Sequence, residues 1–170
     1  MEKMNLYNNK KELIEKEFIR ESGEPEEGEY KLSVHVWIIN DQKEFLIQKR
    51  SRNRKVNPSK WGFTGGGVDF GETSVEGALR ETKEELNINT NKDNIELILS
   101  FKREHDFVDV WLIRQNVKIS DITLQKEEIS EVKHVSFNAL KEMIKNEEFV
   151  PAVNLYFDTF KKLLNKCQII

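Results

Sequence analysis

Short apolar runs along the chain predict a series of β-strands. The run Lys31–Ile39 (KLSVHVWII) becomes apolar on both faces towards its end, which is typical of a strand in the centre of a sheet. The polar turn Asn40–Lys43 separates it from the run Glu44–Lys49, so we expect these two strands to pair as a hairpin. The other strands that the pattern predicts are Trp61–Thr64, Ile95–Phe101, Val108–Val117 and Glu131–Val135.

Apolar residues at helical spacing mark the main helix. Thr73 and Glu76 form a Thr-x-x-Glu capping box, in which each side chain can bond the backbone amide of the other residue. Asn87 can end the helix because asparagine tolerates the left-handed conformation. The apolar stripe between these ends consists of Val75, Ala78, Leu79, Thr82 and Leu86.

Two further helices are predicted later in the chain. Ser136 can cap a helix that runs through Ile144. Pro151 suits the first turn of a final helix, because proline lacks only an amide that would be unpaired there. Residues 118–130, ahead of these helices, are mostly loop by composition.

Residues 1–30 are predicted to form an arm outside a single domain that spans residues 31–170. Met4–Leu6 and Glu17–Ile19 are candidate short strands within this arm. The segment Glu21–Gly28 has the composition of a loop and is most simply a solvated connector. The alternative is that the whole arm is a dimer-forming flap, since it precedes the main sheet and has little core of its own.

Composition narrows the class of protein. A chain of 170 residues fits one domain, and a domain of that size buries about 70% of its unfolded surface. The net charge of -3 does not favour general binding to nucleic acid or to an anionic membrane. The single Cys167 excludes an internal disulfide framework and suits a reducing cytoplasm. No apolar run is long enough to span a membrane, so we expect a soluble cytoplasmic protein.

Three glutamates are crowded onto the main helix. Glu81, Glu84 and Glu85 fall within an arc of roughly 100° on a side that is distinct from the apolar stripe. In water their repulsion is small, and a solvated acidic face would be the simplest explanation. Opposite phosphates they would require a cation, and Mg²⁺ prefers such carboxylate oxygens. The glycine turn Gly65–Gly67 favours this second interpretation, because glycines let the backbone approach a ligand closely.

A basic segment precedes the glycine turn. Guanidinium groups suit phosphate oxygens because they can donate paired hydrogen bonds. We expect one or two of these cations to bind substrate, foremost Arg50 or Arg52, and the others to be solvated. The cations of this segment are Lys49, Arg50, Arg52, Arg54, Lys55 and Lys60.

The stretch Gly66–Ile88 (GGVDFGETSVEGALRETKEELNI) resembles the Nudix box, the signature of the Nudix hydrolase family. The pattern is G-x5-E-x7-R-E-U-x-E-E-x-G-U, with U an aliphatic residue. Thr82 stands where an aliphatic residue is usual, and Asn87 replaces the last glycine; neither is a proposed metal ligand. The residues that match in register are Gly66, Glu72, Arg80, Glu81, Glu84, Glu85 and Ile88.

The resemblance implies a Nudix fold, which is an α/β/α sandwich around a mixed β-sheet, over residues 31–170. Family members typically hydrolyse a nucleoside diphosphate that is linked to another group, and they use Mg²⁺ or Mn²⁺ to do so. The implied partner is therefore a small-molecule nucleotide diphosphate, and family habit suggests a homodimer. No feature of the sequence selects one substrate, because specificity in this fold resides largely in loops outside the box.

The resemblance also implies a set of metal ligands. Glu81 and Glu85 would be the main ligands, Glu84 would help, and the carbonyl of Gly65 would complete the site. Arg80 would orient the glutamates by ion pairing.

Two further box positions would be structural: Glu72 would brace the loop and helix, and Gly66 would shape the turn. The general base would be Glu81 or, as in some family members, a glutamate of a later loop. Glu127 and Glu128 occupy such a loop here, where an exposed acidic loop is an equally good explanation.

Two other functions fit parts of the sequence. His35–Ser51 (HVWIINDQKEFLIQKRS) looks like the isopentenyl-diphosphate isomerase branch of the same fold. That enzyme relies on a cysteine near the strand leading into the box, whereas Trp61–Gly67 (WGFTGGG) contains none. A non-catalytic Nudix-like binding domain is the second alternative, but such domains commonly lose box glutamates that this chain keeps. Both alternatives are therefore disfavoured.

Overall fold

The central element of the fold is strand β3, Lys31–Ile39, in a computed structural model that describes residues 2–152 and 157–167. The main sheet has seven strands, and five of them follow the order β5-β4-β3-β8-β7, with β6 paired to β3 and β9 to β4. The other strands are β4 (Phe45–Arg50), β5 (Trp61–Gly62), β6 (Thr64–Gly67), β7 (Ile95–Lys102), β8 (Asp106–Arg114) and β9 (Ile129–Val135).

One edge of β3 is shared between two antiparallel partners. Its first half, Ser33–Val36, pairs with the glycine strand β6, and its last two residues, Ile38 and Ile39, pair with β4. The other edge pairs in parallel with β8 along its whole length. The predicted central position of this strand and the predicted hairpin are confirmed, and the sheet is mixed.

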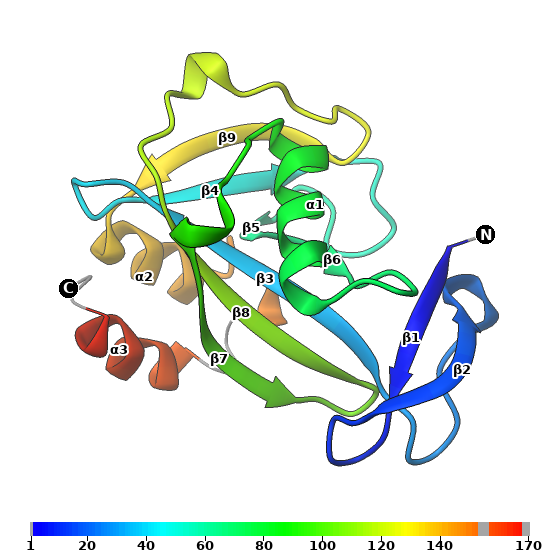
Figure 1. Ribbon diagram of the computed structural model, residues 1–170. Helices are drawn as coiled ribbons and strands as arrows, with labels where there is room; N and C mark the ends of the chain where they lie inside the picture. The colour runs from blue at the N-terminus through cyan, green and yellow to red at the C-terminus, as the bar shows by residue number, and fades with distance from the viewer. Residues whose placement is uncertain (1, 153–156, 168–170) are drawn as a thin grey trace.

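Alternate residues of β3 serve two different cores. Val34, Val36 and Ile38 pack with Ala78 and Leu86 of helix α1 (Ser74–Leu86) on one face of the sheet. Figure 1 shows α1 on this face and helices α2 (Phe137–Lys145) and α3 (Phe157–Lys166) on the opposite side. The architecture is the expected α/β/α sandwich.

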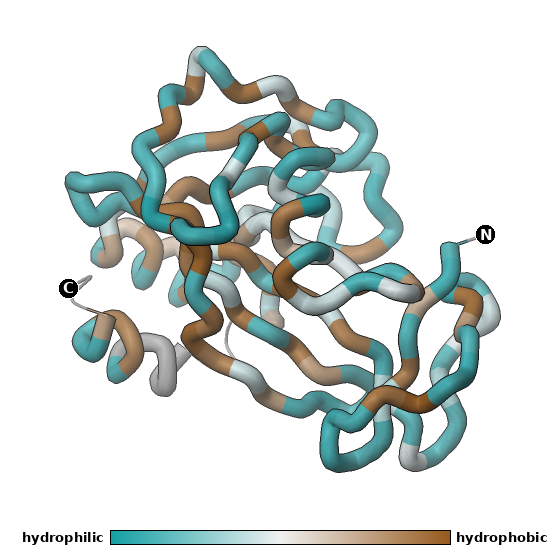
Figure 2. The backbone as a smooth tube through the Cα atoms, in the orientation of Figure 1, coloured by the Kyte–Doolittle hydropathy of each residue, from teal (hydrophilic) through white to brown (hydrophobic). Residues whose placement is uncertain are grey.

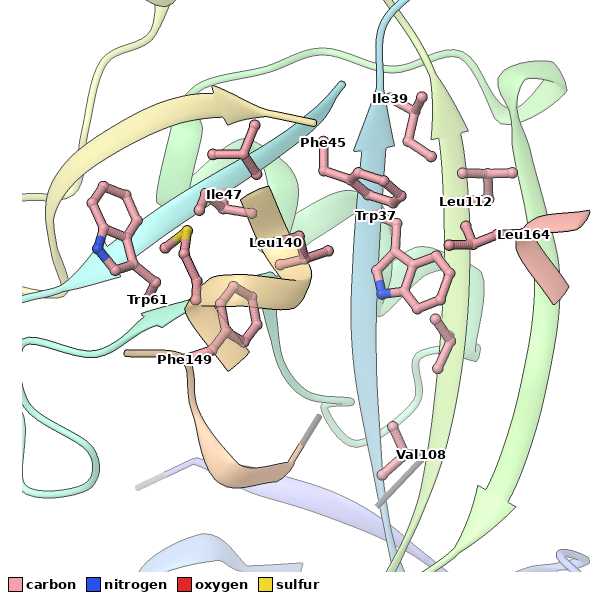
Figure 3. Close-up of a cluster of buried hydrophobic side chains, with 13 residues drawn as sticks. Trp37, Ile39, Phe45, Ile47, Trp61, Val108, Leu112, Leu140, Phe149 and Leu164 are labelled. Atoms are coloured by element: carbon pink, nitrogen blue, oxygen red, sulfur yellow. The ribbon is translucent and has the colours of Figure 1, made fainter. Parts of the chain in front are cut away.

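The second core lies between the sheet and the last two helices. Trp37 from β3 packs there with Phe45, and their ring centroids are 6.2 Å apart. Leu140 of α2 and Leu164 of α3 are both fully buried in the same cluster (Figure 3). Figure 2 shows hydrophobic residues along the central strands and mostly hydrophilic residues in the loop between β4 and β5.

The N-terminal arm forms a separate two-stranded sheet of β1 (Lys3–Tyr7) and β2 (Leu13–Ile19), which confirms the two candidate strands. Met4 and Leu6 are buried, at 3% and 0% exposure. The arm holds the loop that precedes α1, because the Phe70 amide donates to the Lys3 carbonyl at 2.9 Å. Figure 1 shows β1 beside this loop.

Several predicted boundaries differ from the structure: the predicted strand Trp61–Thr64 is divided into β5 and β6, and the ends of other strands are displaced. Strand β8 starts at Asp106, two residues earlier than predicted, because Ser33 and Arg103 donate hydrogen bonds to the Asp106 carboxylate. It ends at Arg114 rather than Val117, since β3 offers no partner beyond Ile39. Strand β9 begins at Ile129, which is 1% exposed and pairs with β4.

Short 3-10 turns connect several of these elements. They are η1 (Arg20–Ser22), η2 (Lys92–Asn94) and η3 (Ile119–Asp121). The beginning of the predicted final helix near Pro151 runs into residues outside the described part, but α3 is present from Phe157. Within residues 2–152 and 157–167, no helix combines the length and apolar character needed to cross a membrane.

Helix α1 begins and ends as its sequence predicts. The Thr73 side chain accepts from the Glu76 amide at 3.4 Å, and the Glu76 carboxylate accepts from the Thr73 amide at 2.9 Å. Asn87 adopts the left-handed conformation, with φ 55°. Local hydrogen bonds therefore fix where the acidic helix starts, and with it the direction of the glutamates.

Replacing Thr73 with alanine should destabilise the protein by about 1 kcal/mol, because the Thr73 hydroxyl accepts from the Glu76 amide and donates to the Glu76 carboxylate. Urea denaturation followed by circular dichroism would measure this change. Thr123→Ala is the matched control, since Thr123 is exposed in the loop between η3 and β9. Equal stabilities for the two variants would contradict a stabilising cap.

Candidate active site

A polar cavity of about 560 Å³ lies against the glycines and the acidic helix face of the predicted box. Gly65, Gly66, Arg80, Glu81 and Glu84 form one wall of this cavity. The remaining walls come from the N-terminal arm, from the loop after β4 and from the loop before β9. Segments far apart in the sequence thus meet at the acidic face of α1.

The glycines are required because the backbone and a glutamate approach each other closely. A Cβ atom on Gly65 would overlap the carbonyl oxygen of Val34, and one on Gly66 would overlap the carboxylate of Glu81. Gly65 also has φ +154°. The absence of side chains at these positions lets α1 pack directly on strand β6.

Glu85 is the most deeply buried of the three box glutamates, at 2% exposure. Its Oε2 atom accepts from Gln48 Nε2 at 2.8 Å and from the Gly65 amide at 3.1 Å. Gln48 in turn accepts from Thr64 Oγ1 at 3.3 Å. Burial raises the pKa of Glu85 to about 8, the Glu81 charge adds to this shift, and the hydrogen bond from Gln48 opposes it.

Arg80 connects the other acidic residues of the box. Its guanidinium donates to Glu72 Oε1 at 2.9 Å, to Glu81 Oε1 at 3.0 Å and to Glu84 Oε2 at 3.2 Å. It also donates to the Gly67 carbonyl at 2.8 Å. Burial opposes the charge of Arg80, but the bond to Glu72 and the charge of Glu81 outweigh it and raise the pKa of Arg80.

Glu81 faces the cavity from the middle of this cluster. Burial raises the pKa of Glu81, while the charge and hydrogen bond of Arg80 lower it, as does the charge of Arg20. The side chain of Glu81 is only 12% exposed, whereas that of Glu84 is 53% exposed. Glu81 is thus held in place, and Glu84 has room to turn.

The donor set of carboxylates and a backbone carbonyl consists of hard oxygen atoms, which suit Mg²⁺ or Mn²⁺. Among the residues that the structure describes, no three His, Cys, Asp or Glu side chains converge as a metal centre. In the structure Glu81 and Glu84 pair with Arg80, while Glu85 accepts from Gln48.

The facing wall combines basic and acidic side chains from two loops. Arg54 and Glu128 form an ion pair at 2.7 Å, and both line the cavity together with Lys55 and Gln125. The Gln125 amide donates to the Glu85 carbonyl at 3.2 Å, which ties this loop to the end of α1. A phosphate group between the walls would meet cations on one side and carboxylates on the other.

The structure brings some predicted site residues together and separates others. Glu128 reaches the cavity, whereas Glu127 lines a neighbouring depression that shares Arg54 and Lys55 with the cavity. Arg50 and Arg52 are not among the described residues that line the cavity. Arg50 lines the same depression as Glu127, and its Nε donates to the Val56 carbonyl at 3.0 Å.

Several residues in or beside the cavity were not predicted from the sequence. Gln48, the partner of Glu85, could have been found, because it is an amide that directly follows the apolar run Phe45–Ile47 of β4. Arg54 and Lys55 lie in the predicted basic segment, but their spacing does not distinguish them from their neighbours. Arg20 belongs to the arm and gave no signal in the sequence.

Comparison with known proteins identifies the family of this chain. Residues 29–153 match the family model of the NUDIX domain. The chain is 39% identical over 153 residues to the uncharacterized Nudix hydrolase lin0387 of Listeria innocua, and the match covers 89% of each chain.

Solved structures share the fold. The structure of DR0079 from Deinococcus radiodurans has a TM-score of 0.74 at 22% identity, covering 91% of this chain and 96% of that one. The MutT protein of Methanosarcina mazei has a TM-score of 0.61 at 30% identity, covering 81% and 94%. With its box, its fold and these relatives, the chain belongs to the Nudix hydrolase family and is a Nudix-type pyrophosphohydrolase.

Proposed function

We propose that this enzyme hydrolyses the diphosphate linkage of a nucleoside diphosphate that is joined to another group, with Mg²⁺ or Mn²⁺ as cofactor. The observation that carries the proposal is a single cavity in which Glu81 and Glu84 face Arg54 and Lys55. Acidic and basic walls of this kind suit a polyanionic substrate that is bound together with a metal ion.

Glu81, Glu84 and Glu85 would hold the metal ion, with the carbonyl of Gly65 as a further ligand. A bound divalent ion would offset the negative charge that develops on the diphosphate and activate a water molecule. Arg80 would keep Glu81 and Glu84 within reach of the ion, since it already pairs with both.

Proton removal from the attacking water requires a carboxylate at the cavity. Glu128 and Glu81 both line it, and Glu127 does not, which favours the first two as general base. Glu128 is paired with Arg54 at 2.7 Å, so a phosphate that drew Arg54 away would leave the carboxylate able to accept a proton.

Arg54 and Lys55 are the cations of the basic loop that we propose to bind substrate phosphate, in place of Arg50 and Arg52. Both line the cavity, and Arg54 can offer the paired donors that phosphate oxygens accept. The isomerase alternative has less support, because Cys167 follows α3 and does not line this cavity. A homodimeric state and a cytoplasmic location stay predictions.

Product release from a panel of nucleotide diphosphate compounds should reveal one class that is cleaved with Mg²⁺ or Mn²⁺ and not cleaved with chelator.

Glu85→Gln should lower kcat by about 100-fold or more, because it removes one metal-binding charge. Glu96→Gln, on the exposed face of β7, is the matched control. Turnover without metal, or a fully active Glu85→Gln enzyme, would contradict the metal assignment.

The pH dependence of stability, measured with chelator so that no metal ion is bound, should reveal the raised pKa of Glu85. Since the pKa of Glu85 rises from 4.5 to about 8, the folded state holds a proton within that window that the unfolded state has lost. Stability from this group therefore falls as pH rises through the window. Glu85→Gln lacks the titration, so its Tm relative to wild type should rise between about pH 5 and about pH 8. A Tm difference that does not vary with pH would refute the assigned pKa.

Replacing Arg54 with alanine should raise KM about tenfold, because one charge-assisted hydrogen bond to phosphate is lost. Arg54→Lys should restore part of the loss, since it keeps the charge but not the paired donors. Steady-state kinetics would measure both, with Lys145→Ala as control because its side chain is 77% exposed on α2. An unchanged KM in Arg54→Ala would remove this residue from the binding site.

A further inference from the structure

The N-terminal arm supplies one wall of the active-site cavity. Arg20, the first residue of η1, lines the cavity together with Glu2 and Glu21. The same cavity is lined by Glu81 and Glu84 of α1. Residues 1–30 are therefore in a position to act on whatever this cavity binds.

Arg20 is held against the glycine strand by the fold of the arm. Its amide donates to the Glu2 carbonyl at 2.9 Å, which fixes its backbone beside β1. A Cβ atom on Gly67 would overlap Nη2 of Arg20, so the guanidinium lies directly on the strand that leads into the box. The carbonyl of Gly67 accepts from Arg80 on α1. Two guanidinium groups thus flank one glycine.

The two arginines differ in their partners. Arg80 is occupied by Glu72, Glu81, Glu84 and a backbone carbonyl. Arg20 has an ion pair with Glu2 through Nη1, and that carboxylate is 57% exposed. An ion pair between exposed side chains contributes little free energy, so Glu2 is easily exchanged for a stronger ligand. A phosphate offers more charge and more acceptor atoms than the carboxylate.

We propose that Arg20 binds a phosphate group of the substrate from the arm side of the cavity, and that Glu2 occupies Arg20 until the substrate arrives. This proposal rests on the proposed function, because it assigns Arg20 to the same diphosphate substrate. Arg20 and the basic loop would then hold the diphosphate from separate segments, and the arm would be a part of the active site.

Binding of methylenediphosphonate with Mg²⁺, measured by isothermal titration calorimetry, tests the proposal without any need for turnover. Arg20→Ala should weaken the affinity about tenfold, which is the loss expected for one charge-assisted hydrogen bond. Lys3→Ala is the matched control, since Lys3 is an arm cation that pairs with Glu17 and does not line the cavity. Its affinity should equal that of wild type.

Glu2→Gln separates a binding role from a structural one. If Arg20 binds phosphate, this variant should bind methylenediphosphonate as tightly as wild type or more tightly, because the competing carboxylate is gone. If Arg20 only holds the arm through Glu2, Glu2→Gln should weaken binding as much as Arg20→Ala does, and the proposal fails. Weaker binding of Mg²⁺ alone by Arg20→Ala would overturn it too, since loss of a cation should not disfavour a metal ion.

The two proposals fail in different ways. If the panel of nucleotides is not cleaved but Arg20→Ala still weakens methylenediphosphonate binding, the proposed function falls and the role of Arg20 stands. If nucleotides are cleaved and Arg20→Ala binds and turns over like wild type, the role of Arg20 falls and the function stands. Absence of methylenediphosphonate binding to the wild-type protein would refute the role of Arg20.

Discussion

The contacts of one guanidinium group hold the acidic face of this enzyme together. Arg80 bonds Glu72 of the preceding loop, the carbonyl of Gly67 in β6, and two glutamates of its own helix. Like charges at this spacing repel each other on a helix, and a cavity strengthens that repulsion by excluding water. A cation with five donors in a fixed plane offsets the repulsion and joins loop, strand and helix at one point.

Glu85 is stabilised by neutral hydrogen-bond donors and not by the guanidinium of Arg80. Two neutral donors, the Gln48 side chain and the Gly65 amide, bind one of its oxygen atoms. Neutral donors stabilise a carboxylate less than a cation does, so burial dominates and the pKa rises to about 8. A carboxylate that is costly to ionise alone gains most from a nearby divalent cation, which is consistent with the proposed role of Glu85.

Local signals made the box and its helix predictable. The capping box, the apolar stripe and the left-handed Asn87 all act within a few residues, so the sequence determines them directly. The choice among six basic residues was not predictable, because it depends on how the loop after β4 turns. Asn57 and Ser59 have positive φ angles of 50° and 60°, so two residues other than glycine set the course of this loop.

The arginines at the cavity differ in how easily a substrate could displace the carboxylates that they bind. Arg80 uses its donors within the fold, so it stays a part of the scaffold. Arg20 and Arg54 each hold a carboxylate, Glu2 and Glu128, that is at least 30% exposed. Such pairs cost little to break. An entering phosphate would therefore exchange with these carboxylates without disturbing the scaffold, and the one released from Arg54 is a candidate for the general base.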